Sequence, residues 1–141
     1  MSLLQTALAT VLDAALGIWL GSIVFFSFVG APTTFDVLGD DAGQVVNAIF
    51  PKYYVFGAGL GVAAFAAVLV GGLVTVFDAA RIGLLAAVAA GIGMNAYARW
   101  VLIPKMDRAG DDAFAQYHKQ SVALNAVTML AIGIALVLSH A

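Results

Sequence analysis

The polar residues between Asn95 and Asn125 carry most of the chemistry that this apolar sequence can offer. Asn95 and Arg99 are four residues apart, so an α-helix would place both on one face. His118, Ser121 and Asn125 follow at spacings of three and seven, which again define a single helical face. An arginine keeps its charge inside a membrane, so it needs an anion, several oxygen atoms or water nearby. The pattern predicts a pocket that holds a small anionic or polar ligand.

Further polar side chains are expected to reach the same pocket from neighbouring segments. A lysine and two tyrosines stand together where a long apolar stretch begins, and another lysine and an aspartate stand in a short charged connection. A lysine would help Arg99 to hold an anion, and His118 would be the titratable member of the pocket. In the alternative reading, Arg99 extends to the membrane interface beside Trp100 and serves no site. The additional predicted ligand-binding residues are Lys52, Tyr53, Tyr54, Lys105 and Asp107, with Ser27 as a further candidate.

The composition of the chain identifies its solvent as lipid. Of its 141 residues, 63% are apolar and 10% are charged, and the mean hydropathy is +1.03. Soluble domains are about 45–50% apolar and about 25% charged. A net charge of -2 provides no basic surface, so nucleic acid is not an expected partner. The chain has no cysteine, which excludes disulfides and thiolate chemistry.

Four apolar stretches predict an all-α integral membrane protein, in which one domain forms a bundle of four transmembrane helices. A helix crosses the hydrocarbon with about 20 residues. Pro32 and Pro104 are expected to end two of the helices, and Pro51 is expected to begin another. The more polar segment 33–50 is expected to form short amphipathic helices at the interface. The expected spans are residues 4–29, 51–77, 82–103 and 113–138.

The distribution of basic residues predicts an orientation in the membrane. Four crossings place both termini on one side. The loop side would receive Lys52, Lys105 and Arg108, whereas the terminal side would receive Arg81 alone. Because cytoplasmic loops are enriched in Lys and Arg, the loop side is expected in the cytoplasm and the termini outside. The expected location is the plasma membrane.

Two structural contacts are also predicted. A carboxylate inside the first span, Asp13, is costly without a partner, and Arg81 in the turn between the second and third spans would neutralise it as a structural ion pair. Small residues spaced four apart allow two membrane helices to approach closely. A homo-oligomer is therefore expected through glycine-rich faces that contain Gly17, Gly21, Gly57 and Gly61.

Taken in order, these residues resemble the transmembrane protein 205-like family of small four-helix membrane proteins, a domain of unknown function. The resemblance implies four transmembrane helices and brings no settled activity, although the association of the eukaryotic namesake with tolerance of platinum drugs suggests transport or trafficking. A looser similarity links the chain to small haem-binding membrane proteins of the protoporphyrinogen oxidase type, in which His118 and Arg99 would stand in for the histidine and the basic residue. The matching pieces are Gly17-Ile-Trp19-Leu-Gly21, Phe28, Ala31-Pro32, Phe35, Phe50-Pro51, Tyr53-Tyr54, Asn95, Arg99-Trp100, Pro104-Lys105-Met106-Asp107, Phe114, His118, Ser121 and Asn125.

Three functions remain open from the sequence. The leading hypothesis is a positively charged pocket that binds a small anionic or polar ligand or a lipid headgroup, with transport through an oligomer as its extension. The second is a haem- or metal-dependent membrane enzyme that uses His118, although a lone histidine falls short of the about four ligands of a structural zinc site. The third is a structural or assembly subunit without a site. The pattern favours binding over catalysis, and no catalytic residue or cofactor belongs to the leading hypothesis.

Overall fold

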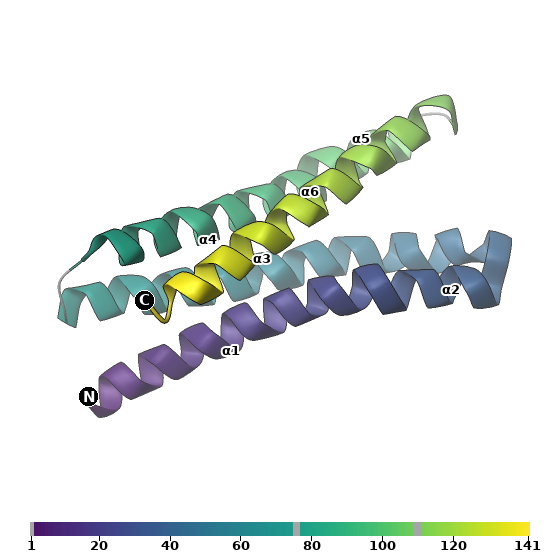
Figure 1. Cartoon of the computed structure of the whole chain (residues 1–141). Coiled ribbons are helices and arrows are strands. Elements are labelled where there is room, and N and C mark those ends of the chain that lie inside the picture. The colour runs from purple at the N-terminus through teal and green to yellow at the C-terminus, as the bar shows by residue number, and fades with distance from the viewer. Residues whose placement is uncertain (1, 75–76, 109–110) are drawn as a thin grey trace.

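The computed structural model describes residues 2–74, 77–108 and 111–141. This part of the chain is almost entirely helical and contains no β-strand, which confirms the predicted all-α class. Long helices run alongside one another, and shorter helical segments extend them at one end (Figure 1). The long helices are α1 (Leu3–Phe25), α3 (Ala42–Val74), α4 (Ala79–Tyr97) and α6 (Asp111–Leu138).

The long helices form a bundle with two distinct ends. The first residues of α1, the end of α3, the start of α4 and the C-terminus lie at one end, which we call the terminal end (Figure 1). The start of α3 and the start of α6 lie at the opposite end, which we call the loop end. Helix α3 packs against α1 and α4, and α6 packs against α4 and α1. Consecutive long helices therefore run antiparallel.

Helical stretches long and apolar enough to cross a membrane indicate a membrane protein. By length and composition, the described part of the chain has three of them, Leu3–Gly72, Ala79–Arg108 and Gln116–Leu138. The first is 70 residues long and folds back on itself at Gly39, so that α1 and α3 lie side by side (Figure 1). Gly39 has φ of 56°, in the left-handed region that glycine adopts without steric cost.

Two helices begin with side-chain caps that local sequence encodes. At α1, the Ser2 hydroxyl accepts a hydrogen bond from the Gln5 backbone N–H, and the Gln5 side chain accepts one from the Ser2 N–H. This reciprocal capping box satisfies two backbone donors that lack helical partners. At α4, Asp78 Oδ1 accepts from the Arg81 N–H at 2.8 Å. The caps define where α1 and α4 start.

Helix continues past two prolines that the sequence predicted as helix ends. A π-helical segment precedes each proline, and a short α-helix that contains the proline follows. These elements are η1 (Phe26–Gly30), α2 (Ala31–Leu38), η3 (Ala98–Leu102) and α5 (Ile103–Arg108).

The π segments explain why Pro32 and Pro104 are tolerated. In an α-helix, the proline ring clashes with the carbonyl of the residue four positions earlier. Here the residue before each proline bonds five positions back: the Ala31 N–H donates to Phe26, and the Ile103 N–H donates to Ala98. This wider turn moves the carbonyls away from the ring, so the chain stays helical.

The predicted interfacial segment 33–50 is helical, but it has a different division from the one expected. It comprises most of α2, the 3-10 turn η2 (Gly39–Asp41) and the first part of α3. Helix α3 begins at Ala42, so Pro51 lies inside this helix and does not start it. The break between the two helical pieces is at Gly39–Asp41.

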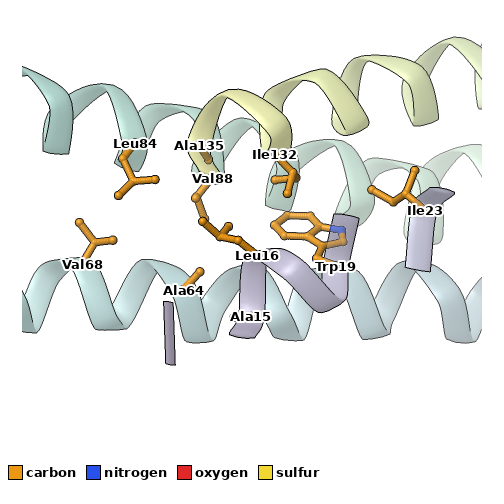
Figure 2. Packing of buried hydrophobic residues seen from close by; sticks show 10 residues of the cluster. All are labelled: Ala15, Leu16, Trp19, Ile23, Ala64, Val68, Leu84, Val88, Ile132 and Ala135. Atoms are coloured by element: carbon orange, nitrogen blue, oxygen red, sulfur yellow. The ribbon is translucent and has the colours of Figure 1, made fainter. Parts of the chain in front are cut away.

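The hydrophobic core is centred on Trp19 of α1, which is 1% exposed. Figure 2 shows its indole ring lying close to Ile132 of α6, with Leu16 and Val88 on the side toward the terminal end. Leu16, Val88 and Ile132 are also completely buried. One large ring thus fills the space where α1 meets the other long helices.

Glycines beneath the indole make this packing possible. A Cβ at Gly57 would lie 2.6 Å from Trp19 Nε1, and one at Gly61 would lie 2.8 Å from Trp19 Cζ3. A Cβ at Gly91 would lie 2.7 Å from Trp19 Cη2. The Gly57 and Gly61 face, which the sequence assigned to an oligomer, is therefore covered by a tryptophan of the same chain. Contact between copies through Gly17 and Gly21, which have no such neighbour within 4 Å, stays a prediction.

Candidate ligand-binding site

A cavity of about 280 Å³ lies at the loop end of the bundle. Residues from η1, α2, α3 and α6 line it, so segments distant in the sequence build it together. It gathers the polar residues that the sequence predicted from the fourth span, together with the paired tyrosines, but neither of those predicted from the third span. The polar residues that line the cavity are Ser27, Tyr53, Tyr54, His118, Ser121 and Asn125.

One polar chain crosses the cavity from α3 to η1 through Asn125 of α6. The Tyr53 hydroxyl donates to Asn125 Oδ1 at 2.5 Å. Asn125 Nδ2 then donates to Ser27 Oγ at 2.7 Å. Each hydrogen bond joins a different pair of helical segments, so the carboxamide holds η1, α3 and α6 in fixed relation.

A second polar chain lies deeper and reaches α4. The hydroxyl oxygens of Tyr54 and Ser121 are 3.2 Å apart and share a hydrogen bond. Asn95 Nδ2 donates to the Tyr54 backbone carbonyl at 3.3 Å. All three residues are buried. Asn95 therefore supports Tyr54 from behind and does not line the cavity.

Aromatic rings surround these polar groups. The Phe26 ring lies 4.9 Å from Tyr53 and 5.5 Å from Phe50, measured between ring centroids. The Phe50 and Tyr54 rings stack at 6.0 Å, and Tyr53 meets Tyr54 edge-on at 5.1 Å. Contacts of this kind contribute about 0.5–1.5 kcal/mol each beyond area burial. The rings thus fix the directions of both tyrosine hydroxyls.

The rim of the cavity is apolar and opens to the outside of the bundle. Phe35 of α2 is 50% exposed and Val122 of α6 is 56% exposed, and both line the cavity. Pro32 and His118, which also line it, are exposed as well. An opening between α2 and α6 would face the lipid in a membrane. The remaining apolar lining residues are Phe26, Ala31 and Phe50.

The charged residues predicted for the pocket lie outside it. Arg99 is absent from the cavity lining, and its Cζ lies 5.8 Å from the centroid of the Trp100 ring. Trp100 is 59% exposed, so this cation–π pair sits on the outer surface. Lys52, Lys105 and Asp107 are exposed and do not line the cavity. The predicted cationic residues therefore do not line the loop-end cavity, and a role for them in ligand binding stays a prediction.

The length of the arginine side chain separates its guanidinium from Asn95. The rule that residues four apart share a face places their Cα atoms and does not fix where a long, flexible side chain ends. Asn95 is buried inside the bundle. Arg99 is partly buried, and its guanidinium lies beside the exposed Trp100 ring.

The carboxylate of Asp13 lies beside a histidine from the C-terminal end of the chain. His140 Nε2 lies 3.2 Å from Asp13 Oδ1, close to the C-terminus and away from the loop-end cavity. The sequence had named Arg81 as the partner. Both side chains of the Asp13–His140 pair are about half exposed or more, so the pair contributes little to stability.

A second cavity lies at the terminal end and has a volume of about 310 Å³. Leu8 and Leu12 of α1, Asp78, Arg81 and Leu138 are among its lining residues. None of the residues predicted to bind a ligand lines it. The loop-end cavity is therefore the candidate site.

The sequence did not identify the apolar part of the site. Phe26, Phe35 and Val122 line the cavity but were not among the predicted site residues. One available signal was missed: Phe50, Tyr53 and Tyr54 are spaced three and four apart, so they occupy one helical face. An aromatic face beside two tyrosines could have indicated an aromatic cavity.

The site residues fit haem poorly. His118 lines the cavity, but its neighbours there are hydroxyl, amide and apolar groups, and Arg99 does not reach it. Among the described residues, no group of three or more His, Cys, Asp or Glu could hold a metal ion. An engineered cavity of about 150 Å³ in another protein holds a single benzene ring. A space of about 280 Å³ is small on that scale for the four rings of a porphyrin.

The apolar helical stretches and this cavity indicate a class: a helical membrane protein with a mainly apolar cavity, which contains a few polar side chains, at one end of its bundle. The chain belongs to the family described as "Domain of unknown function (DUF4149)", which matches residues 14–115. An "Uncharacterized protein" of Aquifex aeolicus (strain VF5) is 32% identical over 133 residues, which cover 89% of this chain and 92% of that protein. No solved structure matches. The resemblance to the transmembrane protein 205-like family is not confirmed by these matches.

Proposed function

We propose that this protein crosses the membrane four times and binds a small, uncharged, mainly apolar molecule in the loop-end cavity. The observation that carries the proposal is the neutral hydrogen-bond network of Tyr53, Asn125 and Ser27 inside an aromatic wall. The four crossings are supported by α1 and α3, which lie side by side within one 70-residue apolar stretch. The orientation and the plasma-membrane location inferred from the sequence stay predictions.

The charge of the lining favours a neutral occupant. The described residues that line the cavity include no Lys, Arg, Asp or Glu. An ion taken out of water without a partner loses several kcal/mol of hydration. The polar ligand inferred from the sequence is therefore retained in the proposal, whereas the anion is replaced by an uncharged group.

The exposed rim supports access from the bilayer. Phe35 and Val122 present apolar side chains at the mouth of the cavity, which suits a molecule that already partitions into lipid. The polar groups lie further in, where they can receive the polar end of such a molecule. Ligand pockets commonly combine apolar walls with a few well-placed polar groups.

Closing the mouth of the cavity tests the proposal directly. Val122→Trp places a large ring at an exposed position of the lining, and Val127→Trp places the same ring on α6 at a position that is 51% exposed and outside the lining. We expect non-covalent small-molecule adducts, observed by native mass spectrometry of protein released from lipid nanodiscs, to disappear in Val122→Trp. They should persist in Val127→Trp.

Two outcomes would contradict the proposal. Wild-type protein that never carries a small-molecule adduct beyond ordinary phospholipid would leave the cavity without an occupant, and the assembly-subunit hypothesis would then be preferred. Equal adduct retention in Val122→Trp and Val127→Trp would place the binding elsewhere.

The haem alternative is tested by absorption spectroscopy. A Soret band in the purified protein that is lost in His118→Ala would support it.

Neutralising Arg99 is expected to leave binding unchanged. Its guanidinium lies over Trp100 on the outer surface, so Arg99→Gln should alter adduct occupancy by less than about twofold. Asn125→Leu removes the carboxamide that positions Tyr53 and Ser27, and should lower occupancy about tenfold, which corresponds to about 1.4 kcal/mol of binding free energy. Native mass spectrometry at matched protein concentration measures both variants. A large loss in Arg99→Gln would restore the charged pocket inferred from the sequence.

A further inference from the structure

We propose that the occupant of the loop-end cavity is a planar ring that carries a carbonyl oxygen, as in quinones and aryl ketones. This inference rests on the proposed function and narrows it to one chemical class. The structural basis is the combination of aromatic walls with polar groups that have hydrogens left to donate.

The shape of the wall favours a planar ring. Phe26, Phe50 and Tyr53 contribute ring faces and edges from η1 and α3, and Phe35 adds another ring at the mouth. Aromatic rings pack best against one another in offset-stacked or edge-to-face arrangements. A flat unsaturated molecule can make such contacts on several sides, whereas a flexible chain would have to be ordered first at an entropic cost.

The hydrogen bonds leave a surplus of donors. Tyr53 uses its hydrogen on Asn125 Oδ1, and Asn125 uses one of its two amide hydrogens on Ser27 Oγ. The second amide hydrogen is not consumed by these bonds, whereas the Ser27 hydroxyl also hydrogen-bonds with Tyr53. The Tyr54–Ser121 bond likewise uses only one of the two hydroxyl hydrogens.

A carbonyl oxygen can accept hydrogen bonds from the donors that are left over. It has two lone pairs, so it can accept from two of the uncommitted donors, and it brings no hydrogen that would need an acceptor. A carboxylate would also accept, but it would bring a negative charge, and the described lining offers no Lys or Arg to balance it, only the exposed imidazole of His118. The donor surplus and the absence of Lys and Arg together favour an uncharged acceptor.

The volume limits the size of the ring system. A cavity of about 150 Å³ accommodates one benzene ring in another protein. At about 280 Å³, the loop-end cavity has room for one or two fused rings. A substituent or tail on the ring can leave through the apolar rim beside Phe35 and Val122.

Probes that differ in one property each test this class. Menadione is a two-ring quinone, 2-methylnaphthalene has the same rings without carbonyls, 1-decanol has a polar head without rings, and 1,4-naphthoquinone-2-sulfonate carries a negative charge. The absence of cysteine excludes thiol adducts of the quinones. Binding to the full chain in nanodiscs is measured by saturation-transfer NMR titration, with Val122→Trp as the blocked reference. We expect menadione to bind at least about tenfold more tightly than each of the other three probes, because only menadione combines rings, carbonyls and neutrality.

Two serines of the same helical stretch distinguish the loss of a polar lining group from a general loss of stability. Ser27 lines the cavity, whereas the Ser22 hydroxyl bonds the Trp19 carbonyl and does not line the cavity. Ser27→Ala should lower menadione affinity about fivefold and leave 2-methylnaphthalene affinity unchanged. Ser22→Ala should leave both affinities unchanged.

The outcomes distinguish this inference from the proposed function. If 1-decanol binds as tightly as menadione and both are blocked in Val122→Trp, the cavity binds apolar molecules and the ring carbonyl class is wrong. If 2-methylnaphthalene binds as tightly as menadione, the donor argument is wrong. If the sulfonate binds as tightly as menadione, the site is not selective for neutral molecules. If no probe or native adduct binds, the proposed function fails together with the inference.

Discussion

Replacing Trp19 with alanine is expected to lower the free energy of unfolding by about 3–5 kcal/mol, the usual range for removing a buried Trp or Phe. The side chain is 1% exposed and lies against Leu16, Val88 and Ile132 at the centre of the bundle (Figure 2). Three glycines shape the space that it fills, so neighbouring side chains cannot easily move in to close the cavity. The loss should therefore fall in the upper part of that range.

The measurement is unfolding in detergent micelles by titration with a denaturing detergent, followed by circular dichroism. Trp100→Ala is the matched control, because Trp100 is 59% exposed and should contribute less than about 1 kcal/mol. Trp19→Phe adds a second comparison, since Trp19 Nε1 is buried without a hydrogen-bond partner and its removal relieves a cost of about 1–3 kcal/mol. Equal losses in Trp19→Ala and Trp100→Ala would contradict the assigned core.

The second large effect is expected from a single methyl group on α3. In Gly57→Ala the new Cβ would lie 2.6 Å from Trp19 Nε1 and closer still to Asn95 Nδ2. Overpacking of this kind costs about 1–3 kcal/mol. Asn95 supports the Tyr54 carbonyl, so the change should also reduce ligand occupancy in the loop-end cavity.

Gly59→Ala is the control on the same helix. A Cβ at Gly59 would meet nothing within 4 Å, and alanine is a better helix former than glycine by about 1 kcal/mol. Gly59→Ala should therefore be neutral or stabilising under the same denaturing titration. Gly57→Ala and Gly59→Ala would have similar stabilities if the indole of Trp19 did not rest on α3. Gly91→Ala and Gly93→Ala offer the same contrast on α4.

The fold class follows from composition because almost any chain this apolar must bury its backbone polar groups in helices within lipid. The association of Tyr53, Tyr54, Ser121 and Asn125 could also be predicted. Ser121 and Asn125 are four apart on one face of a helix that stays regular, so the spacing rule applies to them. The structure brings them to the tyrosines of α3 through hydrogen bonds of 2.5 and 3.2 Å.

The position of the Arg99 guanidinium could not be predicted, because residue spacing places Cα atoms and not the end of a long, flexible side chain.

The two π segments could not be predicted either. Nothing in Ala98-Arg-Trp-Val-Leu102 indicates i→i+5 bonding except the proline that follows shortly after it. The same arrangement precedes Pro32 at η1. Two prolines that usually stop a helix were therefore read as boundaries, although each belongs to a helix widened to accept it.

The apolar residues that line the loop-end cavity were not predicted for a different reason. In a membrane protein, a phenylalanine on a helix can face lipid, the core or a cavity with little difference in local sequence. Phe35 and Phe56 are each 50% exposed, yet only Phe35 lines the cavity. That distinction depends on where α2 stands beside α6, which hydropathy does not encode.

A transmembrane voltage would do almost no work on an occupant of the loop-end cavity. The field acts with about 2.3 kcal/mol per elementary charge for each 100 mV. The described lining holds no Lys, Arg, Asp or Glu, and a quinone or ketone has no net charge, so nothing in the filled site shifts charge along the field. Occupancy should accordingly be the same in energised and de-energised vesicles, set by how much of the molecule dissolves in the surrounding lipid.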